Sequence, residues 1–170
     1  VVSGTPQALN FTNTYAASGS VTFSGAKTLE GRALTDADTF AFSVSEDGTA
    51  NTWTAASDAS GAIAYPTISY TLADLGTHTY TVREASTDGA GITVDTRAYK
   101  VTVDVADNGD GTLNVIVSDN AGKLDFVNTY AASGSIDFAG TKTLTGRAMV
   151  AGEFTFQVLE GDAVVSTGSN

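Results

Sequence analysis

Short stretches of alternating apolar and polar residues run along the chain, separated by turn residues. Side chains on a β-strand point to opposite faces in turn, so residues two apart share a face. This alternation predicts seven strands and no long amphipathic helix. The expected strands cover residues 19–29, 38–46, 62–72, 78–85, 97–106, 112–118 and 124–130, with turns at 107–111 and 120–122. Seven strands in about 115 residues indicate an all-β, immunoglobulin-like sandwich.

The chain also contains an internal repeat. The stretches FTNTYAASGS (11–20) and FVNTYAASGS (126–135) are identical at nine of ten positions. The same spacing of 115 residues relates SGAKTLEGRAL (24–34) to AGTKTLTGRAM (139–149). A fixed period of this kind indicates a tandem array. We therefore expect residues 1–15 to be the last strand of one repeat, 16–130 to be a complete repeat, and 131–170 to be the first strands of the next.

Three polar residues fall on the apolar faces of their strands. Parity places Lys27, Glu84 and Asn128 among inward aliphatic and aromatic residues. Burying an unpaired charge or amide costs free energy, so we expect a single reason for the inward placement of all three residues. One reading is a buried hydrogen-bonded triad. The incomplete copies carry Asn13 and Lys142 at the positions of Asn128 and Lys27.

The motifs AKTLEGRAL, YTVREA and FVNTY carry these residues in the order lysine, glutamate, asparagine. Together they resemble the streptococcal pilin isopeptide linkage domain of Gram-positive surface proteins, which is close to the CnaB-type sandwich. The resemblance implies that Lys27 and Asn128 condense with loss of ammonia and that Glu84 acts as the proton shuttle. Asn13 and Lys142 would each need partners that the chain does not hold, so they are expected to stay unpaired.

The chemistry implied by this resemblance is plausible for buried groups. Desolvation disfavours the charged forms of both lysine and glutamate, so a proton can pass from Lys27 to Glu84 and leave a neutral amine. A protonated Glu84 is then expected to donate a hydrogen bond to the Asn128 carbonyl. The reaction runs once per molecule, so the chain is expected to be no enzyme beyond this self-catalysed cross-link.

Composition narrows the choice of partners. A net charge of −11 argues against nucleic acid and anionic membranes, which need a basic face. The chain has no cysteine, a single histidine (His78), and no apolar run long enough to insert in a membrane. The acidic turn at 106–113 lacks the ligand spacing of an EF-hand. We expect neither a metal nor a cofactor, and a solvated His78 at the start of a strand.

These observations lead to two functional hypotheses. The first is a structural repeat of an extracellular stalk, adhesin or pilus shaft on a bacterial cell surface, anchored to the cell wall through parts outside this chain. The alternative is an adhesive module that recognises host glycan or protein, for which Trp53 could provide a stacking platform. Expected partners are neighbouring repeats, possible host ligands, and neighbouring chains through pairing of Phe11–Tyr15 with residues 135–144.

Overall fold

The computed structural model describes residues 8–118 and 123–170. The expected turn at 120–122 lies outside the described residues. The chain divides into two compact units, with the boundary between Ala132 and Ser133. Within the described residues, the only helix is a 3₁₀ turn, η1 (Leu72–Asp74), and the remaining regular elements are strands.

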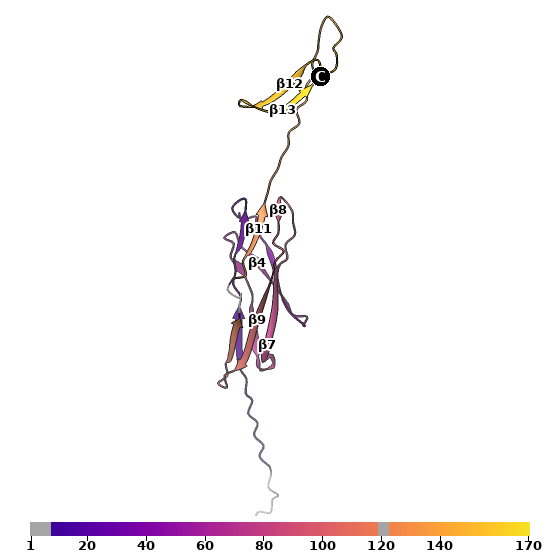
Figure 1. The fold of residues 1–170 in the computed structure, drawn as a ribbon. Coiled ribbons are helices and arrows are strands. Elements are labelled where there is room, and N and C mark those ends of the chain that lie inside the picture. The colour runs from indigo at the N-terminus through magenta and orange to yellow at the C-terminus, as the bar shows by residue number, and fades with distance from the viewer. Residues whose placement is uncertain (1–7, 119–122) are drawn as a thin grey trace, which may run out of the picture. The chain divides into compact units, whose positions relative to one another are not determined.

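The first unit is a β-sandwich (Figure 1). One layer is a six-stranded antiparallel sheet. Its strands, in spatial order, are β10 (Leu113–Ser118), β9 (Ala98–Asp107), β7 (Gly76–Glu84), β3 (Ala41–Glu46), β4 (Thr52–Ser57) and β5 (Ile63–Ala64). The other layer consists of two small sheets, β1 (Ser18–Thr22) with β6 (Thr67–Thr71), and β2 (Lys27–Glu30) with β11 (Phe126–Tyr130) and β8 (Ile92–Thr93). The expected all-β, immunoglobulin-like sandwich is confirmed.

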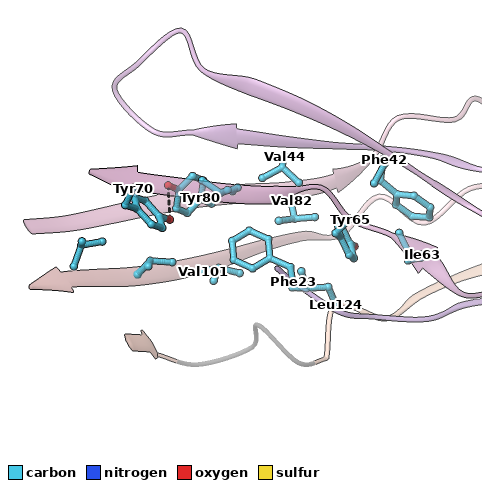
Figure 2. Close-up of a cluster of buried hydrophobic side chains, with 14 of the residues drawn as sticks. Phe23, Phe42, Val44, Ile63, Tyr65, Tyr70, Tyr80, Val82, Val101 and Leu124 are labelled. Atoms are coloured by element: carbon cyan, nitrogen blue, oxygen red, sulfur yellow. Dashed lines mark hydrogen bonds between the residues drawn. The ribbon is translucent and has the colours of Figure 1, made fainter. Parts of the chain in front are cut away.

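The hydrophobic core lies between these layers and is rich in aromatic rings (Figure 2). The Phe42 ring on β3 has its centroid 5.0 Å from that of Phe126 on β11. The Phe23 ring, between β1 and β2, lies 5.6 Å from the Tyr80 ring on β7. Buried and exposed residues alternate along β3, β6 and β9, as the period of two requires. The sequence pattern therefore reports the inward faces of these strands correctly.

The number of strands differs from the expected seven. The strand expected at 19–29 divides into β1 and β2, which belong to different sheets. Gly25 lies at this break, where an added Cβ would be 2.1 Å from the carbonyl oxygen of Leu124. The strand expected at 62–72 divides into β5 and β6 around Pro66, which has no N–H to donate to a sheet. Two strands, β4 and β8, had no clear alternating signal because β4 is rich in small and hydroxyl residues and β8 has two residues.

The second unit contains one hairpin, β12 (Thr155–Glu160) and β13 (Ala163–Ser169). Its loop before the hairpin repeats an arrangement of the first unit. Arg147 pairs with Glu153 and donates to the carbonyl of Ala148. In the first unit Arg32 pairs with Asp38 and donates to the carbonyl of Ala33 in the same way.

Two further local contacts recur in the second unit. The Asn170 side chain accepts a hydrogen bond from the backbone N–H of Phe154, as Ser57 does from Phe40. The Lys142 amine lies 4.9 Å from the centre of the Phe154 ring. Lys27 lies at the same distance from Phe40. The residues from Lys142 to Asn170 thus share several local contacts with the residues from Lys27 to Ser57, although no strand equivalent to β2 begins at Lys142.

Candidate functional site

Lys27 and Asn128 lie on neighbouring strands of the same small sheet. Strands β2 and β11 run parallel, with Lys27 opposite Phe126 and Asn128 opposite Leu29. The two residues are therefore diagonal neighbours, and both side chains point to the buried face of the sheet. Lys27 is 1% exposed and Asn128 is 0% exposed. The inward direction expected from their parity is thus observed for both.

Glu84 reaches the same place from the opposite layer. It is the last residue of β7, opposite Phe42 on β3, and its side chain is fully buried. The carboxylate oxygen Oε2 lies 3.4 Å from Lys27 Nζ. The other oxygen, Oε1, accepts a hydrogen bond of 2.8 Å from Asn128 Nδ2. One carboxylate therefore contacts both the amine and the amide.

The orientation of the Asn128 amide follows from a backbone contact. The N–H of Asp95 donates a 2.7 Å hydrogen bond to Asn128 Oδ1. A backbone N–H can only donate, so the amide atom facing it must be the oxygen. The expectation that Glu84 contacts the Asn128 carbonyl is therefore wrong for this structure. Glu84 lies on the NH₂ side of the amide, and Asp95 supplies the donor to the carbonyl.

Asp95 itself is anchored to the strand that carries Asn128. Its carboxylate accepts a hydrogen bond of 2.8 Å from the backbone N–H of Val127 and is paired with the guanidinium of Arg97. Arg97 lowers the pKa of Asp95, so the carboxylate stays ionised. The sequence reasoning missed Asp95. The available signal was the Asp95-Thr96-Arg97 triplet, in which the aspartate accepts from the N–H two residues later.

The surroundings of Lys27 shift its protonation equilibrium toward the neutral amine. Burial lowers its pKa, and the neighbouring Glu84 carboxylate opposes part of this effect. The amine also donates to the carbonyl of Thr28 at 3.2 Å and lies over the Phe40 ring. Within the described residues, Glu84 Oε2 is buried and accepts no hydrogen bond. This oxygen is thus available to take a proton from the amine 3.4 Å away.

The repeat equivalents lie in different surroundings. Asn13 is exposed, in a segment without a strand. Lys142 is also exposed, and within the described part of the chain no carboxylate forms an ion pair with it. Of the five residues singled out in the sequence, the structure brings together Lys27, Glu84 and Asn128.

Two other residues considered from the sequence serve the packing of the sandwich. Trp53 on β4 is half-buried and packs its ring edge-on against Tyr80, at a centroid distance of 5.9 Å. His78 was expected in solvent, but it is largely buried. Its Nδ1 lies 2.6 Å from Glu46 Oε1 and its Nε2 lies 2.7 Å from the carbonyl oxygen of Asp74.

The fold and these contacts define a class: an immunoglobulin-like β-sandwich with a buried lysine, glutamate and asparagine in mutual contact. Residues 23–131 match the family described as FctA, the Spy0128-like isopeptide containing domain, and the chain belongs to this family. The match spans all three residues and confirms the expected relation to pilin isopeptide domains. A search of the curated proteins finds no match to the chain.

Membership of this family defines the general character of the protein. It is a pilin-type structural domain of the cell surface, and the family is not one of catalytic enzymes. Among the described residues, no helix has the length and apolar character needed to cross a membrane.

Proposed function

We propose that this chain is part of a repeated structural module in the stalk, adhesin or pilus shaft of a Gram-positive bacterium. Each module is locked by an isopeptide bond between Lys27 and Asn128 that forms without an external enzyme. The observation that carries the proposal is the position of Glu84, whose two oxygens contact the Lys27 amine and the Asn128 amide. A triad with a purely packing role would not need a carboxylate placed between a nucleophile and a leaving group.

The contacts support a balanced sequence of bond changes. Lys27 first passes a proton to Glu84 Oε2, which leaves a neutral amine. The amine then attacks Cγ of Asn128, and the negative charge that develops on Oδ1 faces the N–H of Asp95. Glu84 carries a proton from the attacking nitrogen to Nδ2, beside its Oε1. The Cγ–Nδ2 bond breaks, and ammonia leaves as the new amide forms.

Folding supplies the rate enhancement that this reaction needs. The three groups come from β2, β7 and β11, and the packed core holds them in place. Effective molarities of well-oriented groups reach about 10⁵–10⁸ M, which allows a slow amide exchange to finish. Because the product has consumed both Lys27 and Asn128, each molecule reacts once.

The second unit supports the tandem arrangement. The loop and hairpin around Arg147 and Asn170 repeat the contacts around Arg32 and Ser57. Apolar residues on both flanks are exposed, with Phe11 at 89% and Ile136 at 74%. In an array of complete repeats, such residues would be covered by the strands of the same repeat. Pairing of these flanks between neighbouring chains stays a prediction.

Intact-mass measurement of the purified chain tests the cross-link. We expect the mass to be lower than the sequence mass by one ammonia, and a peptide linking Lys27 to Asn128 after digestion. In the Glu84→Gln variant, which keeps the shape of the side chain, we expect the full mass. The control is Glu30→Gln, which changes an exposed glutamate on β2 and should still lose ammonia. A folded wild-type chain with the full sequence mass would disprove the proposed cross-link.

A further inference from the structure

Tyr15 is held by the turn between β9 and β10. Its hydroxyl donates a 2.8 Å hydrogen bond to Asp107 Oδ1 and accepts a 3.0 Å hydrogen bond from the N–H of Gly111. Three residues later, the N–H of Ser18 donates to the carbonyl of Gly111. The chain thus enters the sandwich anchored from Tyr15 onward. We call these contacts the entry clamp.

The turn is shaped to receive this segment. Gly109 and Gly111 have φ angles of 79° and 92°, which glycine adopts without strain. The open cavity beside the turn, of about 440 Å³, is lined by Tyr15, residues 16–18 and Thr71 to Ala73 of the η1 region. Two aspartates of this turn accept hydrogen bonds from side-chain hydroxyls. Asp107 binds Tyr15, and Asp110 accepts from Thr112.

The end of the sandwich holds the equivalent tyrosine in another way. Tyr130, the last residue of β11, pairs with Ile92, and the Arg32 guanidinium lies 4.7 Å from its ring centre. The N–H of the next residue, Ala131, donates a 2.8 Å hydrogen bond to the carbonyl of Gly91. The chain therefore leaves the sandwich anchored as far as Ala131. We call these contacts the exit clamp.

The two clamps overlap in the repeated sequence NTYAASGS. The entry clamp begins at Tyr15, which corresponds to Tyr130, and the exit clamp continues to Ala131, which corresponds to Ala16. An array that keeps both clamps would therefore have no unanchored residue between consecutive repeats. Flexible linkers need such free residues, so their absence implies a fixed angle at the joint.

We propose that consecutive repeats meet in a rigid joint held by Tyr130. Its ring stacks on Arg32 of its own repeat, while its hydroxyl enters the Asp107–Gly111 turn of the following repeat. The Arg32 guanidinium interacts with both the ring and the hydroxyl of Tyr130. The two roles are compatible because a hydroxyl can accept two hydrogen bonds, one from Arg32 and one from a backbone N–H, and donate one to a carboxylate. The partner of the acidic turn is thus the exit end of another copy of the repeat. This inference rests on the proposed tandem stalk.

The joint can be tested in a longer chain built from this one. Asn170 occupies the position of Ser57, since each accepts from the N–H of a corresponding phenylalanine. Residues 1–170 followed by residues 58–130 would therefore contain two complete repeats. The chain has no cysteine, so Thr54→Cys and Thr167→Cys, at equivalent exposed positions on β4 and β13, allow one spin label per repeat.

The readout is the distribution of distances between the two labels. We expect a narrow distribution in the parent chain and a broad one after insertion of Gly-Gly between Ala131 and Ala132. Tyr130→Phe keeps the ring on Arg32 but removes the hydroxyl. It should broaden the distance distribution toward that of the Gly-Gly insertion. Tyr15→Phe is the matched control, because it makes the same change before the first repeat and should leave the width unchanged.

The outcomes separate this inference from the proposed function. A parent distribution as broad as that of the Gly-Gly insertion, or an unchanged width in Tyr130→Phe, would overturn the rigid joint. The intact mass of the same samples reports the cross-links, with loss of two ammonia molecules expected. A broad distribution with both cross-links present rejects the joint alone, whereas a narrow distribution with the full sequence mass rejects the cross-link alone.

Discussion

A lysine side chain that is almost completely buried needs specific compensation. Lys27 has it in the Glu84 carboxylate, the Thr28 carbonyl and the face of the Phe40 ring. Burial nevertheless lowers its pKa, which is the condition for nucleophilic attack. The stability of the unreacted site and its reactivity therefore have the same origin: the amine is sheltered from water but remains beside a proton acceptor.

A second titratable group that is largely buried, His78, has a different role. Both ring nitrogens face acceptors, Glu46 Oε1 and the carbonyl of Asp74, and only the imidazolium can donate to both. Burial alone would lower the pKa of His78, but these two hydrogen bonds outweigh it and raise the pKa above 6.5. Burial also raises the pKa of Glu46, whereas hydrogen bonds from Asn51 and His78 lower it overall.

The His78 site makes folding stability depend on pH. A raised pKa contributes stability that is complete below pH 6.5, the ordinary value, and is lost as pH rises through the folded pKa. We expect the free energy of unfolding to fall as pH rises from 6.5 through the folded pKa of His78. This pH dependence should disappear in the His78→Gln variant. Denaturant unfolding at several pH values measures it. Proton NMR titration of this single histidine gives the folded pKa, and a value below 6.5 would contradict the assignment.

At the scale of elements, the position of β2 depends on close backbone approaches. The N–H of Lys27 donates a 2.7 Å hydrogen bond to the carbonyl of Gly61, in the turn between β4 and β5. A Cβ on Gly61 would lie 2.2 Å from the Lys27 carbonyl oxygen. This glycine has a φ of +85°, so an added methyl group would meet both backbone strain and a collision with β2.

The variants Gly61→Ala and Gly48→Ala separate these two effects. Gly48 also has a positive φ, of +76°, but an added Cβ would have no atom within 4 Å. We expect Gly48→Ala to cost about 1–2 kcal/mol from backbone strain, and Gly61→Ala about 2–4 kcal/mol because it adds overpacking. Urea unfolding in a Glu84→Gln background gives both values. Equal costs would show that β2 tolerates the displacement.

Gly61→Ala has a second expected effect when Glu84 is intact. Moving the Lys27 backbone displaces the amine from Glu84 and Asn128, so ammonia loss should be slower than in Gly48→Ala. Mass spectrometry during refolding follows this rate. Misplacements of about 1 Å can slow positioned reactions about a hundredfold, so the rates of ammonia loss in the two variants can differ by a readily measured factor.

At the scale of the whole sandwich, a Lys27–Asn128 bond would join the first and last parts of the first unit. The strands β2 and β11 are parallel neighbours, so force applied at the two ends of the unit loads the contacts between them in shear. A covalent bond at this point would bear the applied force, so the non-covalent contacts of the core would not be loaded. The chain-entropy model for a loop of about 100 residues also gives a stabilisation of about 4–5 kcal/mol.

Single-molecule stretching from the two ends tests this consequence. In the Glu84→Gln chain we expect an unfolding step that releases the residues between Lys27 and Asn128, a length on the order of 300 Å. The wild-type chain should lack that step, because the bond shields these residues. A step of the same length in wild-type chains that have lost ammonia would show that the bond does not protect the sandwich.

Much of the candidate site was predictable from the sequence. The inward direction of Lys27, Glu84 and Asn128 follows from parity, which depends on the local geometry of a strand and survives errors in strand ends. The division of the strand at 19–29 was not predictable. It depends on the approach of Gly25 to Leu124, nearly one hundred residues away in the chain.

The all-β class, the internal repeat and the inward polar residues all follow from short-range patterns, because alternation along a strand is a local property of the backbone. The side-by-side placement of β2 and β11 does not follow from them, because long-range packing of the core selects strand partners. The same is true of the donor from Asp95, which reaches Asn128 because its own carboxylate binds Val127. The residues of the site could thus be identified from the sequence, but the orientation of the Asn128 amide depends on contacts between distant segments.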